Sequence, residues 1–240
     1  MLLSDPKTAA FITSKFVPVW ETIRPAPRVT IDFGDGRTMT RTLKGSTCMY
    51  VVLPDGRVVD ALPGVYTPED FKMLASQSLE FLNGRLSPDL SVSVSDQEIL
   101  AWHRGQVRDV AQNEQMRVST SKAVMESPLL KALGVPPAVD APAANYGTVF
   151  DRYAGRLEDL SSRPMSGRRV KVEAGGQNVV AIDSQVNVRY VRMAVHLMFA
   201  GGDKAPRPAE CRTAMFKKIL HIDPDDPNLG LTAETIPGTP

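Results

Sequence analysis

Residues 44–74 read KGSTCMYVVLPDGRVVDALPGVYTPEDFKML, and this stretch decides the fold expected for the chain. The apolar run Met49–Leu53 is typical of a buried strand, and Arg57–Leu62 has the composition of a return strand. Pro54-Asp55-Gly56 predicts a tight turn between them, because proline presets one turn torsion and glycine accepts a left-handed one. A β-hairpin is therefore predicted here.

A capped helix is predicted directly after this hairpin. Thr67 is a favourable N-cap, and the proline that follows it suits the first helical position. Phe71 and Leu74 begin an apolar face, and the helix should run to Leu82 before Asn83-Gly84 ends it.

Three further elements are predicted upstream of the hairpin. Asp5 to Ser14 has the pattern of a capped helix, and Phe16 to Trp20 follows as a strand, short or at a sheet edge because it contains Pro18. Arg28–Phe33 and Arg37–Leu43 alternate about a Gly-Asp-Gly turn, which predicts a second hairpin. The apolar residues of its first strand would share one face: Val29, Ile31 and Phe33.

This order of helix, strand, Pro-Asp-Gly hairpin and helix resembles the C-terminal half of a thioredoxin-like domain over residues 4–82. The family's Cys-x-x-Cys motif has no counterpart in the chain. Thr47 stands where the family has a cis-proline, and Cys48 follows it. The resemblance therefore implies a remodelled or truncated thioredoxin-like sheet that lacks dithiol–disulfide chemistry.

The remaining sequence predicts an α/β protein with a mostly helical C-terminal region that contains one hairpin. Four parts are expected: a thioredoxin-like domain over 1–84, a helical segment over 85–134, a linker rich in proline and alanine over 135–149, and a helix–hairpin–helix region over 150–240. The hairpin is placed at 168–182, with strands Arg168–Glu173 and Asn178–Ile182. Helices are predicted from Ser95 to about Ala123 and over Ser127–Leu133, Phe150–Leu160, Gln185–Ala200 and Pro208–Ile219.

Composition excludes several classes of function. The 240 residues carry a formal net charge of +1, and aromatic residues make up 6%, so nothing favours binding to nucleic acid or to an anionic membrane. The sequence contains no apolar run long enough to span a bilayer. The first residues, MLLSDPKTAAF, lack the basic start and long apolar core of a signal peptide, and the compartment is left open.

Cys48 is the candidate for chemistry. Its thiol could act as a nucleophile if nearby Lys44 or Arg41 lowered its pKa. Alternatively it is a small buried apolar residue at the start of a strand, which is the commoner place for an unpaired cysteine. Cys211, on a predicted helix, is expected in the core, and a bridge between the two cysteines is the less favoured possibility.

No metal or cofactor site is predicted. The three histidines, His103, His196 and His221, are not spaced to share a helix face as metal ligands. The sequence could still place a histidine beside Cys48 in space. The acidic residues Asp223, Asp225 and Asp226 are interrupted by prolines and read as a solvated tail rather than a calcium loop. Glycine-rich phosphate-binding signatures are missing.

Two functions remain open. The first is a non-catalytic thioredoxin-like protein that acts as an interaction or scaffold subunit, with a protein partner or a second copy as its ligand. The second is a monothiol oxidoreductase that uses Cys48. In the thioredoxin-like arrangement an apolar surface near the hairpin would receive the partner, and the residues expected on it are Trp20, Thr47, Cys48, Pro63 and Tyr66.

Overall fold

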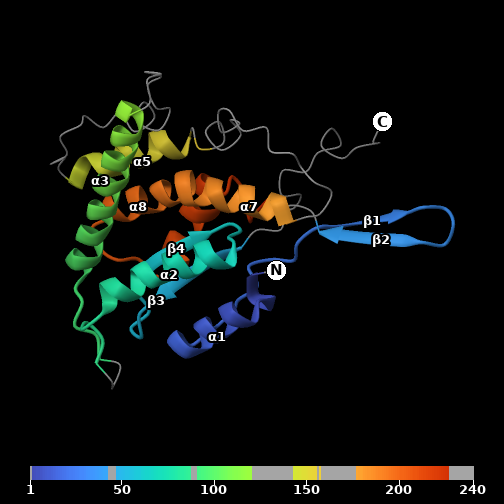
Figure 1. Ribbon diagram of the computed structural model, residues 1–240, viewed down its shortest axis with the longest axis horizontal. Helices are drawn as coiled ribbons and strands as arrows, with labels where there is room; N and C mark the ends of the chain where they lie inside the picture. Colours follow the sequence, from blue (N-terminus) through green and yellow to red (C-terminus); the bar gives the residue numbers. More distant parts are fainter. Residues whose placement is uncertain are drawn as a thin grey trace.

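The computed structural model describes residues 2–42, 47–87, 91–120, 143–155, 157 and 177–226. In this part of the chain two consecutive β-hairpins follow the first helices, and the elements after them are helical (Figure 1). In chain order the elements are η1 (Leu2–Ser4), α1 (Pro6–Lys15), β1 (Arg28–Asp32), β2 (Thr38–Thr42), β3 (Cys48–Val52), β4 (Val58–Pro63), α2 (Pro68–Leu82), α3 (Asp96–Thr120), α5 (Ala143–Ala154), α7 (Gln177–Val186), η2 (Asn187–Val191), α8 (Arg192–Ala200), α9 (Pro208–Thr213) and η3 (Ala214–Ile219). The mixed α/β class and the mostly helical C-terminal region are confirmed.

The β3–β4 hairpin is confirmed and lies in the centre of the fold. Its strands pair antiparallel from Cys48 opposite Pro63 to Val52 opposite Val58. Gly56 takes the left-handed conformation, with φ of 90°, as its place in the turn requires. All six residues of β4 are buried, since both of its faces are covered. This strand therefore contributes side chains to every hydrophobic cluster of the described core.

The predicted helix caps are confirmed. The Asp5 carboxylate accepts a hydrogen bond from the Thr8 backbone N–H at 2.8 Å and begins α1. Thr67 caps α2 by accepting from the Asp70 N–H. Before α3, the Ser95 hydroxyl and the Glu98 carboxylate each accept from the other residue's backbone N–H, which is a capping box.

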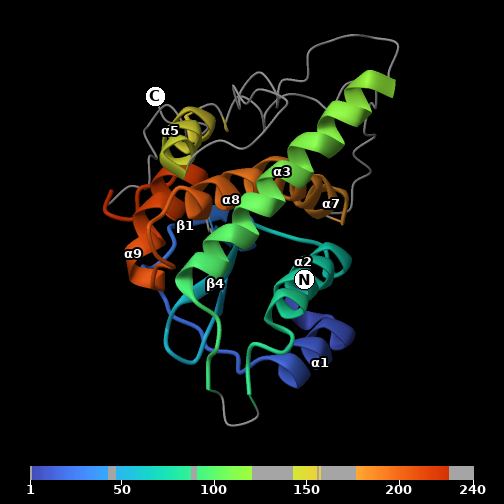
Figure 2. The ribbon, with the colours of Figure 1, turned by 90° about the vertical axis from the view of Figure 1, so that its left-hand side faces the viewer.

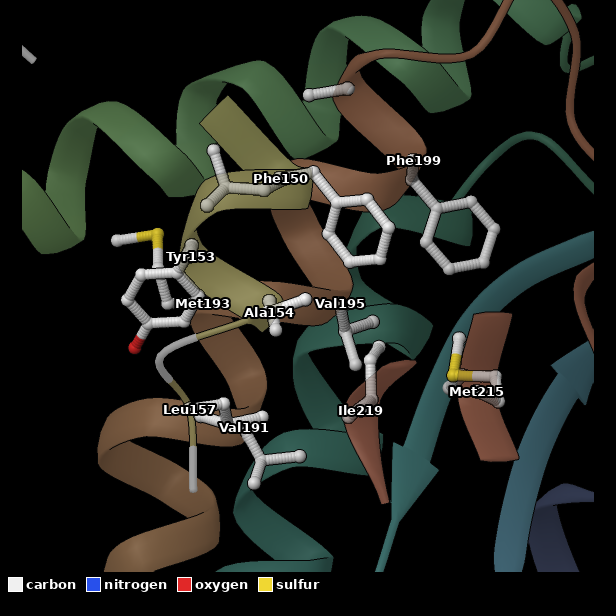
Figure 3. Close-up of a cluster of buried hydrophobic side chains, with 14 of the residues drawn as sticks. Phe150, Tyr153, Ala154, Leu157, Val191, Met193, Val195, Phe199, Met215 and Ile219 are labelled. Atoms are coloured by element: carbon white, nitrogen blue, oxygen red, sulfur yellow. The ribbon is translucent and has the colours of Figure 1, made fainter. Parts of the chain in front are cut away.

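The largest hydrophobic cluster lies between α5, α8 and the helical turns η2 and η3 (Figure 3). Phe150 and Tyr153 of α5 point into it, and Val195 and Phe199 of α8 meet them. Burying each such side chain contributes about 1.5–3 kcal/mol. Val58 and Ala61 of β4 belong to the same cluster, so residues from the predicted parts 1–84 and 150–240 share one core.

Helix α3 crosses α8 on the outside of this core, while α1 and α2 lie together on another side of the β3–β4 hairpin (Figure 2). A smaller cluster joins α1 and α2 to the hairpin through Phe11, Phe71 and Leu62. The central hairpin is thus enclosed by helices from both ends of the sequence.

The second hairpin, β1–β2, extends away from the rest of the molecule as an arm (Figure 1). Its strands pair antiparallel from Arg28 opposite Thr42 to Asp32 opposite Thr38, as the sequence predicts. In the described part of the chain the two hairpins form separate two-stranded sheets rather than one continuous sheet.

Three sequence predictions are wrong. Phe16–Trp20 is not a strand, because Pro18 has no N–H to donate to a ladder. Asn178–Ile182 is not a strand either: it belongs to α7, since its apolar run continues into the helix that follows. Residues 143–149 were expected in the linker but lie in α5, where Tyr146, Val149 and Phe150 share the buried face.

The other predictions of this region concern residues outside the described ranges. They are the helix at Ser127–Leu133, the strand at Arg168–Glu173, the linker before 143 and the end of the helix predicted to reach Leu160.

Candidate functional site

Cys48 lies in a partly buried cluster with Tyr50 and Cys211. Cys48 and Tyr50 are two residues apart on β3, so their side chains share a face of the hairpin. Cys211 reaches them from α9, and both cysteines are free thiols. The Tyr50 hydroxyl is buried beside the thiols, and no described group forms a well-aligned hydrogen bond with it.

The environment of this cluster opposes thiolate formation. Burial raises the pKa of Cys48 to about 12 and that of Cys211 to about 11. Burial likewise raises the pKa of Tyr50 above its ordinary value. Reactive cysteines have a depressed pKa and a cationic neighbour. The two cations expected beside Cys48 are Lys44 and Arg41. Lys44 and the side chain of Arg41 both lie outside the described structure. The described surroundings of Cys48 are those of a structural cysteine.

A second polar site lies deeper, where Arg192 at the start of α8 meets Asp60 on β4. The two guanidinium nitrogens donate to the two carboxylate oxygens at 2.8 and 3.0 Å, and the side chains are 3% and 0% exposed. Ser78 of α2 donates to the same carboxylate at 2.9 Å. Arg192 also donates to the Ala61 carbonyl oxygen at 2.7 Å. These bonds satisfy Asp60 fully, as a buried charge requires.

Two buried histidines extend this network. Arg192 is always a donor, so the His196 Nε2 atom, 3.2 Å away, accepts a hydrogen bond from it. Neutral His196 then carries its hydrogen on Nδ1 and donates to Nδ1 of His103 at 2.8 Å. His103 in turn donates from Nε2 to the Val59 carbonyl oxygen at 2.9 Å. One tautomer of each ring satisfies all of these hydrogen bonds, and both rings are neutral.

Burial is the main reason that both histidines stay neutral. It lowers the pKa of His103 to about 4, and the pKa of His196 is also lowered, by burial and by the adjacent Arg192 charge. Phe199 stacks on His103 with ring centroids 4.3 Å apart. The side chains of the network are at most 3% exposed, and its hydrogen bonds join β4, α2, α3 and α8.

The predicted binding surface is only partly assembled. Cys48 pairs with Pro63 across the hairpin, the Thr47 carbonyl accepts from Gly64 N–H at 2.8 Å, and the Tyr66 hydroxyl donates to the Pro63 carbonyl at 3.1 Å. Pro63 and Tyr66 are buried, however, so they offer no surface to a partner. Thr47 is exposed and Cys48 half-buried. Trp20 is exposed in the segment that precedes the arm.

Exposed apolar side chains gather instead on the segment that leads to the arm and on the arm itself. Val17, Val19 and Trp20 are 89%, 88% and 85% exposed in an extended segment. On the arm, Ile31 of β1 and Phe33, which directly follows this strand, are 42% and 52% exposed on the same face. The opposite face is polar, and Thr30 and Thr40 share a hydrogen bond across it at 3.1 Å.

Sequence reasoning did not identify the network of Asp60, Arg192 and the two histidines. The available signal is that each charged residue interrupts an apolar run, VVDALP for Asp60 and VRMAVHLMFA for Arg192. A charge in such a run predicts a buried partner but does not say which one.

None of the helices among the described residues is long and apolar enough to cross a membrane, and these residues contain no group of three or more His, Cys, Asp or Glu side chains that could hold a metal ion. No protein-family model, curated protein or solved structure matches the chain.

Proposed function

We propose that the protein is a non-catalytic interaction subunit that binds a protein partner through the β1–β2 arm and the segment Val17–Trp20. The observation that carries this proposal is the exposure of large apolar side chains on a projecting two-stranded ribbon. A hairpin of two strands is marginally stable in water unless a third strand or another surface covers its apolar face. A partner on the Ile31–Phe33 face would supply that cover.

The arm also offers main-chain groups to a partner. Within the described residues both of its strands are edge strands, because β1 and β2 pair only with each other. Unpaired strand edges bind extended peptides or other sheets, with main-chain hydrogen bonds giving affinity and alternate side chains giving specificity. The expected ligand is therefore a polypeptide in extended conformation with apolar side chains at alternate positions.

The remodelled thioredoxin-like relationship stays part of this proposal. The order β3, β4 and α2 agrees with it, and the buried Tyr66 and Pro63 move the binding surface away from the face that the family would use. The second candidate, a monothiol oxidoreductase, requires a lowered pKa at Cys48. Burial has the opposite effect on this thiol, which favours the non-catalytic function.

Photo-crosslinking in the producing cell tests the proposal. A photoreactive phenylalanine analogue is placed at Trp20 or Phe33, and a control at Glu80, which is exposed on α2 away from the arm. We expect one discrete crosslinked adduct from each of the first two positions and none from Glu80. The same adduct at position 20 should be lost when Phe33→Ser removes the apolar face of the arm.

The composition of that adduct is read by mass spectrometry. An adduct with a distinct polypeptide or with the chain itself supports an interaction function. The proposal is wrong if neither position gives an adduct that exceeds the Glu80 control, or if Phe33→Ser leaves the Trp20 adduct unchanged.

A further inference from the structure

We infer that the partner of the β1 edge is a second copy of this chain, paired antiparallel across a two-fold axis at Thr30. This inference rests on the proposed function and names its partner. The result is a four-stranded sheet in the order β2–β1–β1–β2, built from the arms of two copies.

The direction of the main-chain groups on β1 supplies the first argument. Phe33 N–H donates to the Arg37 carbonyl at 3.1 Å, so Phe33 and Arg37 face each other within the arm. Antiparallel pairs alternate between bonded and non-bonded, which directs the N–H and C=O groups of Ile31 and Val29 toward β2 as well. The groups of Arg28, Thr30 and Asp32 are therefore directed to the outer edge of β1, which pairs with no other described strand.

These three residues are self-complementary. When two β1 strands run antiparallel with Thr30 opposite Thr30, Arg28 of each copy stands opposite Asp32 of the other. Opposite charges directly across an antiparallel pair stabilise it, and like charges destabilise it. The residues with free N–H and C=O groups form the hydrogen-bonded pairs, so one register satisfies both the main chain and the charges.

The side chains between these pairs are complementary too. In the same register Val29 of each copy lies opposite Ile31 of the other. These β-branched residues continue the apolar face of each arm across the two-fold axis, and side chains of this kind pack favourably across strands. Arg28 and Asp32 are exposed, so both are accessible to a second copy. The closed two-fold pairing leaves β2 on each outer edge.

The other edge of the arm does not have these properties. Its outward residues are Thr38, Thr40 and Thr42, which carry no charge, so two β2 strands would have no charged pair to fix their register. A one-residue slip in pairing moves every side chain to the other face, so an edge that sets its own register is the better candidate for specific pairing. This difference selects β1 over β2 as the surface for the second copy.

Two charge-reversal variants of the purified full chain, studied alone and as a mixture, test the inference. Arg28→Asp gives a strand with two acidic residues, and Asp32→Arg gives one with two basic residues. In sedimentation velocity we expect each variant alone to dimerise about tenfold more weakly than the wild type, because both cross-strand pairs become repulsive. An equimolar mixture should form a heterodimer close to wild-type strength, since both pairs are then opposite in charge.

Two controls separate pairing from folding. Glu80→Lys reverses an exposed charge on α2, away from the arm and outside the proposed register, and dimerisation should be unchanged. A cysteine at Thr30 should form a disulfide between copies under mild oxidation, because it lies on the two-fold axis. A cysteine at Thr40, which lies on the same face but on β2, away from the proposed two-fold axis, should not form a disulfide between copies.

The inference is overturned if the wild-type chain is monomeric at about 1 mM, if the mixture fails to restore association, or if Thr40→Cys crosslinks as well as Thr30→Cys. A distinct polypeptide crosslinked from Phe33, with the purified chain monomeric, would overturn the second copy as partner and leave the interaction function standing. Failure of every crosslink in the cell would instead overturn the proposed function itself.

Discussion

Arg192 on α8 and Asp60 on β4 form a two-point ion pair in which neither side chain has more than 3% of its surface in contact with solvent. The pair connects the central hairpin to α8, the helix that contributes the most residues to the largest cluster. Taking two charges out of water costs several kcal/mol, and that cost is offset only when each charge has its full set of partners. Asp60 has them, from Arg192, Ser78 and its neighbouring Ala61 N–H, whereas the buried Nε of Arg192 has no partner among the described residues.

Replacing Arg192 by Met is expected to destabilise the fold by about 3–5 kcal/mol, because it leaves the Asp60 carboxylate buried without a cation. The double variant Asp60→Asn/Arg192→Met should be less destabilised than the sum of the two single variants, by about 1 kcal/mol or more. Urea unfolding followed by circular dichroism measures both. Arg37→Met is the matched control, since the Arg37–Asp35 pair is exposed and should contribute less than about 1 kcal/mol. Additive single effects would contradict a direct Asp60–Arg192 interaction.

The histidine pair predicts how stability depends on pH. Its members are neutral in the fold, and the pKa of His103 lies at about 4 against about 6.5 in the unfolded chain. The unfolded state therefore binds more protons below pH 6.5, so stability is complete above that pH and falls as the pH drops from 6.5 toward 4. The slope should approach 1.4 kcal/mol per pH unit for each histidine. Protonated His196 would also face Arg192.

Urea midpoints between pH 8 and pH 4.5 test this dependence. His103→Gln keeps a group that can hydrogen-bond but does not titrate, so the stability of this variant should fall less steeply with acid. His221→Gln, at an exposed position, should leave the slope of the wild type unchanged. Equal slopes for His103→Gln and the wild type would refute the assignment.

The elements that sequence predicted well are those whose signals are local. Asp5, Thr67 and Ser95 each cap a helix through a partner three residues away, and such a contact is present in the sequence itself. The Asp-Gly turns of both hairpins are equally local. These helix starts and the two Asp-Gly hairpins could therefore be predicted without knowledge of the tertiary structure.

The predictions that were wrong or missing concern features that depend on distant residues. Asp60 and Arg192 lie 132 positions apart, and only packing brings them together. Residues 178–182 are apolar and β-branched enough for a strand, yet they continue the long helix that ends at Ala200. Tyr66 looked like a loop residue but is fully buried. The exposure of Trp20, and that of Ile31 and Phe33 on the arm, is likewise a property of the folded chain.

Cys48 should be slow to alkylate. A thiol with a pKa of about 12 carries on the order of 1 part in 10,000 as thiolate at pH 8, against roughly a quarter for a free cysteine. In the Cys211→Ser variant, the iodoacetamide reaction followed by mass spectrometry should therefore be at least about a hundredfold slower than for the unfolded chain, and should accelerate up to pH 10. A reaction midpoint below pH 8.5 would favour the monothiol oxidoreductase instead.

The last prediction concerns the contact between α5 and the end of α8. A Cβ added at Gly201 would lie 2.6 Å from the Gly147 backbone nitrogen and 2.9 Å from its Cα, so α5 and α8 approach too closely there for any side chain. Gly201 has φ of −85°, which any residue adopts, so the requirement for glycine comes from space alone. Gly201→Ala should separate the two helices and cost about 1–3 kcal/mol.

Gly147 provides the matched control on the other side of the same contact. A Cβ at Gly147 meets nothing within 4 Å, and the residue lies inside α5, where alanine is preferred to glycine by about 1 kcal/mol. Gly147→Ala should therefore leave the melting temperature unchanged or raise it, while Gly201→Ala lowers it. Opposite signs from two identical substitutions across one contact would establish the close packing of α5 on α8. If both variants lower the melting temperature equally, the helices do not meet in this way, and the core of Figure 3 is arranged differently.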